Sequence, residues 1–521
     1  MKKHILILVP LMFILVGSSC KKFLAESSQD EIIPSTTDDL AALMYSDAYP
    51  YLQPFDTYVD LLTDDVQSNG VPQLNGAPNA TYVPYQTNGV PVFNWSATMF
   101  DNISGTAGSN LSDINGVNSW VAYYTKIKGC NVVLDYINTI SGTAQNKNAL
   151  KGQALFLRAF YYLKLVTLYG QPYSGVGVDP NTSLGVPLVL SSQVSDTYPK
   201  RNTLKEVYAQ IEADLLTAAD LLKNNFTAPS LFRVNHIAAY ALLSRLYLYM
   251  GRDADMDNVI TYANLALAAK PTLTPLTNFI GATGTLNSSG IYDQTLSTEV
   301  IWSYSFNPNS NRSALITFFP QTGSVSGVVP PFTVSNDLYA MYDKGSGNNS
   351  NYGDLRYKLF FSTYFYSGAN YPMRSAKIGT TQLYGDKGLR VAELYLNRAE
   401  ANARKYLSTG QGANQTAALA DLNYLRQNRY DTRTTAYIPV NIADPKQLFK
   451  FLQDERRREL CLEEGLRWID IKRWGLSLTH NLIDASGTST NYQLSSWSKQ
   501  YALQIPYDVI QRNYNLQQNP R

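Results

Sequence analysis

The chain has 521 residues, of which 45% are hydrophobic and 16% are charged, so it is long and apolar enough to fold around a large core. Its formal net charge at pH 7 is +2, and removal of Lys2 and Lys3 with an N-terminal leader would leave equal numbers of basic and acidic residues. A neutral chain offers no positive field to nucleic acid or anionic lipid, and we expect no nucleic-acid partner.

The N-terminal segment has the layout of a secretory signal peptide. In MKKHILILVPLMFILVGSSC, two lysines precede an apolar stretch from Ile5 to Val16, and small residues follow it. A membrane-spanning helix needs about 20 apolar residues, whereas this stretch contains Pro10 and ends sooner. We therefore predict a signal peptide over residues 1–19.

A cysteine stands where that signal ends. Residues 15–20, LVGSSC, resemble a bacterial lipobox, in which the cysteine is the site of cleavage and acylation. The alternative is cleavage near Ser19 with Cys20 there by accident. We favour lipid attachment at Cys20, because two or more acyl chains anchor a protein stably to a membrane. Residues 20–40 are polar and contain Pro34, as expected of a tether behind an anchor.

The next distinct segment, residues 66–116, is dense in Gly, Pro, Asn and Ser, and we expect irregular loops there. Long loops on a rigid scaffold are where binding sites tend to lie. The segment carries a group of aromatic and amide side chains: Tyr82, Tyr85, Phe93, Asn94 and Trp95.

Three amphipathic helices are predicted after this loop segment. In WVAYYTKIKGCNVVLDYI, from Trp120, apolar residues recur at steps of three and four. The second helix covers residues 150–170 and stops at Gly170, and the third covers residues 204–222. Thr203 and Glu206 have the spacing of an N-terminal capping box for the third helix.

The pattern of residues 235–271 predicts two helices. The first ends at Gly251, and the second ends before Pro271. This layout resembles a tetratricopeptide helix pair. Further helices of the same kind are predicted at residues 388–407 and 415–430. Tyrosines within the predicted helices are expected in the core rather than at a ligand, namely Tyr161, Tyr162, Tyr169, Tyr208, Tyr247 and Tyr249.

Residues 272–385 again have loop character, and Tyr304 and Asn307 lie within them. The few cysteines and histidines argue against a zinc site, since Cys130 and Cys461 show no CxxC spacing. We expect both cysteines to be buried free thiols.

The most specific string is DERRRELCLEEGLRWIDIKRWG, residues 454–475. Glu459 and Glu463 are spaced i,i+4, which puts their Cβ atoms about 5–6 Å apart, and a retaining glycosidase needs two carboxyls about 5–5.5 Å apart. Arg456, Arg457, Arg458 and Arg467 in the same string would keep these carboxylates ionised, whereas a general acid needs a raised pKa. We therefore favour an ion-pair network that docks this helix, followed by a turn at Gly465. Trp120, Trp468 and Trp474 are assigned to packing.

This string resembles the signature helix of the SusD/RagB family. The segment IPYDVIQRNYNLQQNP (505–520) is similar to the family's C-terminal end, although Arg521 follows where the family often has Gly. Other pieces also match: GQALFLRAFYYLKLVTLYG (152–170), GVPLVL (185–190), EVIW (299–302) and DLR (354–356).

The resemblance implies a mostly α-helical SusD-like fold with tetratricopeptide-type helix pairs as scaffold, long loop-rich insertions and few short strands. Behind the tether, residues 41–521 would form a single domain. Its N-terminal half, to about residue 271, would carry tetratricopeptide-like helices, and its C-terminal half, 272–521, would carry the signature helix.

The resemblance further implies an outer-membrane lipoprotein, exposed at the cell surface, that captures glycans and passes them to a SusC-like TonB-dependent transporter. It implies no enzyme activity. Its expected partners are the transporter, a glycan and the membrane through the lipid anchor. A glycoside hydrolase, a helical scaffold with protein partners only, and a peptide-capturing member of the same family are the alternatives.

Sugar binding requires flat apolar ring faces together with amide or carboxylate groups for the hydroxyls. We therefore expect ligand contacts at Trp95, Tyr85, Tyr82, Phe93 and Asn94, with Tyr304 and Asn307 as second choices. No catalytic residue and no cofactor are expected. A structural Ca²⁺ at Asp64 and Asp65 or at residues 343–354 is left open, although we favour solvated loops at both places.

Overall fold

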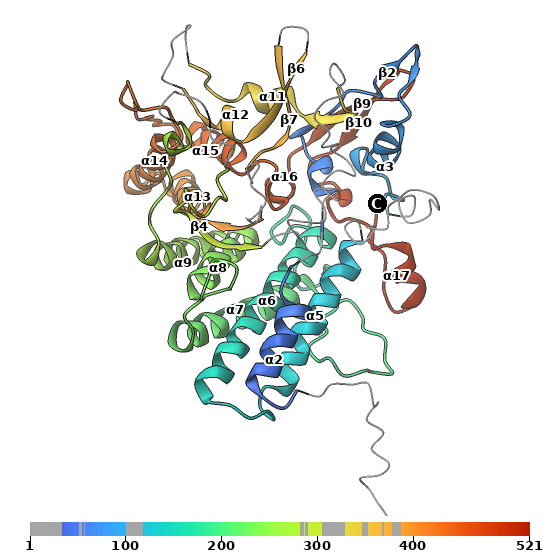
Figure 1. Cartoon of the computed structure of the whole chain (residues 1–521), viewed down its shortest axis with the longest axis vertical. Helices are drawn as coiled ribbons and strands as arrows, with labels where there is room; N and C mark the ends of the chain where they lie inside the picture. The colour runs from blue at the N-terminus through green and yellow to red at the C-terminus, as the bar shows by residue number, and fades with distance from the viewer. Residues whose placement is uncertain are drawn as a thin grey trace, which may run out of the picture.

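The computed structural model describes residues 34–51, 55–56, 58–100, 118–281, 286, 290–304, 329–345, 353–366, 369–377 and 387–521. Within these residues α-helices dominate and strands are short, as the sequence predicts (Figure 1). The predicted signal peptide, Cys20 and the first part of the tether lie outside the described residues. No helix in the described part of the chain is long and apolar enough to cross a membrane.

Four N-terminal helices form the lower part of the molecule in Figure 1: α2 (Thr37–Leu43), α5 (Ser119–Tyr136), α6 (Ala144–Tyr169) and α7 (Leu204–Asn225). The long helix α6 is almost wholly buried because α5 and α7 both pack against it. A Cβ atom on Gly129 of α5 would lie 2.5 Å from the carbonyl oxygen of Asp47, so glycine lets α5 approach the π-helical turn η1 (Met44–Ala48) closely.

The predicted helix ends are confirmed where local side chains fix them. Thr203 accepts a hydrogen bond from the amide of Glu206, and the Glu206 carboxylate accepts one from the amide of Thr203, which is the predicted capping box. Helix α6 ends at Gly170 as predicted. It begins six residues earlier than the predicted segment, since Thr143 caps it.

Four further helices pack as two antiparallel pairs: α8 (His236–Met250), α9 (Met256–Ala269), α13 (Val391–Thr409) and α14 (Gly412–Gln427). Helix α8 packs on α9, α13 packs on α14, and α9 packs on α13. Gly251 ends α8 in the left-handed conformation with φ +68°, which glycine adopts without steric cost. The predicted break at Gly251 is therefore confirmed.

The signature segment forms α15 (Pro445–Leu460) and α16 (Leu466–Trp474). The chain turns between them at Gly465, whose φ is +70°, as predicted. Helix α15 packs against α13, α14 and α16 and so joins the stacked pairs to the C-terminal part of the chain.

The strands form five antiparallel two-stranded sheets among the described residues. The pairs are β1 (Val66–Ser68) with β5 (Phe332–Val334), β2 (Gln73–Leu74) with β3 (Ala77–Pro78), β4 (Val300–Tyr304) with β8 (Lys387–Arg390), β6 (Phe361–Tyr366) with β7 (Ala369–Ser375), and β9 (Leu478–Ile483) with β10 (Ser489–Leu494). Several of them lie along the upper edge of the molecule in Figure 1.

Residues 66–100 are more regular than the expected loop. They contain β1, β2, β3 and the helix α3 (Val83–Phe93). Composition concealed this helix because it contains two prolines, but Pro84 lies in the first turn, where the missing N–H costs nothing, and Pro91 lies close to the end. The remaining short helices are α11 (Asn336–Ala340), α12 (Arg356–Leu359) and α17 (Tyr507–Arg512).

One hydrophobic cluster extends from Leu40 to Leu516 and includes side chains on both sides of residue 271. The tyrosines assigned to the helical core are buried there, as are Trp120 and Trp468. Cys130 and Cys461 are buried free thiols, as predicted.

Candidate functional site

The signature segment places its carboxylates in a buried ion-pair network rather than at an open surface. The carboxylate of Glu459 lies 2.9 Å from Arg429, 3.0 Å from Arg390 and 3.2 Å from Arg356. Glu299 pairs with Arg390 at 2.6 Å and with Arg429 at 3.0 Å. All five side chains are fully buried, so each charge is balanced by protein groups and not by water.

The network continues to both sides along the signature segment. Glu463 lies 2.6 Å from Arg390 and 2.9 Å from Lys377, and it accepts a hydrogen bond from the Tyr292 hydroxyl. Glu455 lies 2.7 Å from each of three arginines, namely Arg356, Arg426 and Arg458. The three glutamates of the segment are thus each held by two or more cations.

This environment argues against the acid role considered for Glu459 and Glu463 through their pKa values, and against the base role because both side chains are buried away from any substrate. Burial by itself would raise the pKa of Glu459, but the Arg429 and Arg390 guanidiniums outweigh burial and hold the pKa at about 2. The pKa of Glu463 is likewise lowered, because Arg390 and Lys377 outweigh the effect of burial. A general acid must be protonated near neutral pH, and neither group is. The predicted ion-pair network is confirmed.

The aromatic residues expected to hold a ligand lie mostly in the interior. The side chain of Trp95 is 2% exposed, and its indole Nε1 donates to the carbonyl of Leu62 at 3.1 Å. His480 stacks between Trp95 and Phe93, with ring centroids 4.2 Å and 4.1 Å away. Phe93 is 1% exposed. Both rings therefore complete the core under α3, and in this conformation neither presents a free face to a sugar.

The other predicted contact residues are scattered. Tyr82 is buried, whereas Tyr85 and Asn94 are partly exposed. Tyr304 is buried next to Phe160 of α6, and its hydroxyl donates to Glu464 at 3.1 Å. Asn307 lies outside the described residues. Ligand contact by these residues stays a prediction. Among the described residues, the structure brings Phe93 and Trp95 together on His480, and it places the ring centroids of Tyr82 and Tyr85 6.2 Å apart.

The carboxylates considered for Ca²⁺ have other partners. Asp64 lies 2.8 Å from Arg467 and 3.1 Å from Arg457, and Asp65 lies 2.8 Å from Arg457. Within the described ranges, no group of three His, Cys, Asp or Glu side chains is placed to hold a metal ion. The middle of the segment 343–354 lies outside those ranges.

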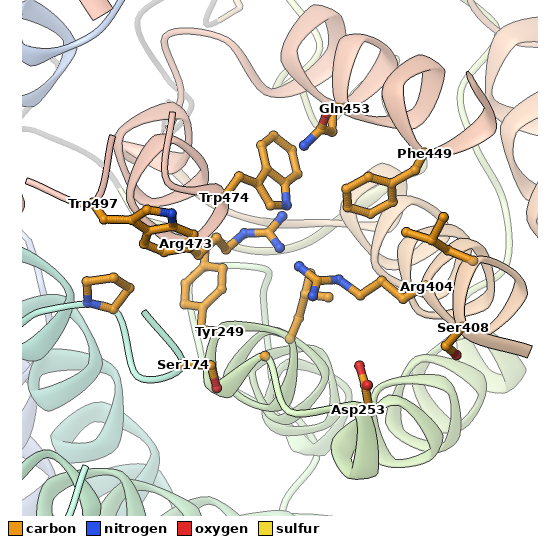
Figure 2. A pocket seen from close by; sticks show the side chains of 14 residues that line it. Ser174, Tyr249, Asp253, Arg404, Ser408, Phe449, Gln453, Arg473, Trp474 and Trp497 are labelled. Carbon is orange, nitrogen blue, oxygen red and sulfur yellow. The ribbon is translucent and has the colours of Figure 1, made fainter. Parts of the chain in front are cut away.

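A cleft of about 410 Å³ opens where the helix pairs meet the signature segment (Figure 2). Its walls come from α8, α13, α15 and α16, from the loop after α6 and from the loop after β10. Figure 2 shows Trp474 and Phe449 on one side, Asp253 on the opposite side and Arg404 reaching between them. Trp497 and Tyr249 complete the aromatic part of the lining.

The position of Trp497 depends on a glycine. Gly475 ends α16 with φ +63°, and a Cβ atom there would lie 2.2 Å from Cε2 of Trp497. Only glycine therefore allows the indole to lie against the end of α16. Trp497 itself has φ +55°, which is uncommon for a residue other than glycine, and such backbone conformations cluster at functional sites.

A buried carboxylate fixes the wall of the cleft that carries Trp474. Glu400 lies within hydrogen-bonding distance of Arg473, lies 2.9 Å from Arg404 and accepts a hydrogen bond from Nε1 of Trp474 at 3.2 Å. Burial would raise the pKa of Glu400, but Arg473 and Arg404 outweigh it and lower the pKa well below its usual range. One ionised carboxylate thus sets the positions of one tryptophan and two arginines.

The lining offers groups that can bind a ligand. It combines ring faces of Trp474, Trp497 and Phe449 with hydrogen-bonding groups of Arg404 and Gln453. Of the fourteen lining residues only Asp253 carries a carboxyl group, whereas glycoside hydrolysis requires two.

Sequence reasoning missed this site. Trp474 had been assigned to packing, but it is half-buried and lines the cleft, and Trp497 had not been considered. The signal in the sequence was Trp497 itself, which lies within the polar run SSWSK. A tryptophan in a polar loop is a candidate for ligand binding.

Two family models match the chain. One, described as starch-binding associating with outer membrane, matches residues 53–248, and the other, described as the SusD family, matches residues 333–521. A similar protein, SusD-like protein P2 of Formosa agariphila, is 26% identical over 451 residues, which are 78% of this chain and 81% of that protein.

Several solved structures share the fold. A SusD superfamily protein of Bacteroides thetaiotaomicron is 22% identical with a TM-score of 0.65, over 93% of this chain and 100% of that chain. A SusD-like carbohydrate binding protein of Bacteroides vulgatus is 21% identical with a TM-score of 0.64, over 92% and 97%. Surface glycan-binding protein A of Bacteroides uniformis is 20% identical with a TM-score of 0.61, over 93% and 99%.

We predict that acid weakens the fold through the ion-pair network. The folded-state pKa values of Glu455, Glu459 and Glu463 lie below the unfolded value of about 4.5, so their stabilisation is complete above that pH and is lost as pH falls towards about 2. Urea unfolding followed by circular dichroism should give a free energy of unfolding that decreases steadily from about pH 5 to about pH 3. A constant value over this interval would contradict the prediction.

We also predict that Glu459→Gln destabilises the fold by about 3–5 kcal/mol, because it leaves buried guanidiniums without full compensation. Asp454→Asn is the matched control on the same helix, where the pair with Lys450 is largely exposed, and it should change stability by less than about 0.5 kcal/mol. Urea unfolding at pH 7 measures both. Equal stability of Glu459→Gln and wild type would mean that Glu459 is not structural.

Proposed function

Because the chain belongs to the SusD/RagB family, we propose that it captures glycans at the bacterial cell surface as an outer-membrane lipoprotein and does not cleave them. The captured oligosaccharide would pass to a SusC-like TonB-dependent transporter for nutrient uptake. Family membership itself rests on two models that together cover residues in both halves of the chain.

The observation that carries this proposal is the lining of the cleft. Aromatic rings beside amide, guanidinium and carboxylate groups are what a pyranose needs, since its C–H face is apolar and its edge carries hydroxyls. The single carboxyl group of the lining leaves no acid and base pair for hydrolysis. The names of two proteins with the same fold, a SusD-like carbohydrate binding protein and a surface glycan-binding protein, agree with this proposal.

The membrane anchor is proposed from the sequence. Cys20 follows a predicted signal peptide, and the polar composition of the residues after Cys20 suits a tether. The description of one matching family, associating with outer membrane, supports this location.

A glycoside hydrolase remains the alternative in another class. Its strongest candidates, Glu459 and Glu463, are buried and ionised, which argues against it. Peptide capture by the same scaffold is a different outcome of the same binding experiment.

We predict that residues 21–521 bind a polysaccharide without releasing reducing ends. Native gels cast with single polysaccharides should retard the protein relative to a blank gel, and a reducing-sugar assay on the same polysaccharide should stay at background. Serum albumin run in each gel controls for non-specific retardation. New reducing ends would establish the hydrolase instead, and binding only to a peptide library would establish peptide capture.

We further predict that Cys20→Ser keeps the full-length protein out of the membrane fraction. Acyl chains need the Cys20 thiol, and no helix in the described residues is long and apolar enough to cross a membrane in their place. Fractionation of cells that express either form, with surface labelling of intact cells, measures the effect. Membrane retention of Cys20→Ser at the wild-type level would contradict lipid attachment at this residue.

A further inference from the structure

The polar groups of the cleft indicate whether its ligand carries a charge. Resting on the proposed function, we propose that the cleft binds a segment of a neutral glycan, with one or more pyranose rings stacked on Trp497 and Trp474 and vicinal hydroxyls bound by Asp253, Arg404 and Gln453. Trp95 and Phe93, which stack on His480, then belong to the core and not to this site.

The two tryptophans are held in place before any ligand arrives. The indole N–H of Trp474 is fixed by Glu400, and the ring of Trp497 lies against Gly475. Both side chains nevertheless stay partly exposed. Rings that are already ordered lose little conformational entropy when a ligand stacks on them, so they bind more tightly than mobile rings.

The hydrogen-bonding groups of the cleft are of both kinds. The Asp253 carboxylate accepts, the Arg404 guanidinium donates, and the Gln453 amide does both. Arg404 uses Nε and Nη2 on Glu400 and keeps 19% of its side chain exposed. A sugar hydroxyl donates and accepts at once, so a diol can bridge an acceptor such as Asp253 and a donor such as Arg404.

The same groups disfavour charged ligands. An acidic sugar would bring its carboxylate or sulfate close to Asp253, and a basic ligand would meet Arg404. Arg473 adds no free positive charge, because Glu400 and Asp470 neutralise it and its side chain is 5% exposed. Arg404 is likewise paired with Glu400, so both cations of the lining already have a carboxylate partner and offer little to an acidic ligand. The lining therefore matches a neutral, hydroxyl-rich molecule.

The size and rim of the cleft fit part of a longer chain. Its volume of about 410 Å³ lies at the lower end of the range of about 300–1,000 Å³ for small-molecule sites. Asp253 and Ser408 on its rim are exposed to solvent. A short stretch within a polysaccharide can thus enter without the chain ends.

The test compares cleft variants of residues 21–521 in native gels that contain neutral or acidic polysaccharides. Trp497→Gly removes the ring but keeps the left-handed backbone at φ +55°, and Trp497→Phe keeps an aromatic face. Asp253→Ala removes the acceptor at an exposed position. Tyr514→Ala is the control, because Tyr514 is 80% exposed and does not line the cleft. Thermal unfolding confirms that each variant is folded.

We expect retardation by a neutral polysaccharide, about tenfold or more weaker for Trp497→Gly and Asp253→Ala, and unchanged for Trp497→Phe and Tyr514→Ala. Folded cleft variants that bind a glycan as well as wild type would overturn the site while the proposed function stands. Retardation of wild type by acidic polysaccharides alone would overturn the neutral class. Absence of glycan binding by wild type would overturn both the proposed function and the site.

Discussion

A charge removed from water must meet an opposite charge inside the protein, and this requirement organises the molecule. Glu459 draws together Arg356, Arg390 and Arg429, which come from three places in the sequence, and Glu299 joins the latter two from a fourth. Removing one partner from such a group leaves an uncompensated charge, so the segments are held in one arrangement. The helix α15 stands between the stacked pairs and the C-terminal part for this reason, and the cleft lies where they meet.

Local signals in the sequence were sufficient to predict most helices of the scaffold. A capping box at Thr203, a left-handed glycine at Gly251 and a turn at Gly465 each act within a few residues, so their effect on the helix ends can be predicted. Helix α3 was not predicted because its two prolines weaken the helical pattern of the sequence, although both occupy positions that a helix tolerates. The charges of the signature segment predicted ion pairs, but two of their partners, Arg356 and Arg390, lie 99 residues before Glu455 and 69 residues before Glu459.

The binding residues were harder to predict because burial is a property of the whole fold. Trp95 lies in a stretch of loop-like composition, yet His480 from the distant strand β9 covers it. Conversely, Trp474 lies in a helical sequence typical of a packing residue, yet it lines the cleft. Its position there is fixed by Glu400 of α13, which accepts a hydrogen bond from its indole N–H. Aromatic content alone could not separate these two cases.

Residues from the C-terminal part of the chain supply hydrogen bonds and ion pairs to residues of the N-terminal third. Arg521 donates to the carbonyls of Trp95 and Ser96, and Arg457 and Arg467 neutralise Asp64 and Asp65. These contacts close loops of roughly four hundred residues, and closing such long loops costs more chain entropy than closing short ones. In the export from the N-terminus that the sequence predicts, these contacts of the first third would form only after the end of the chain has followed.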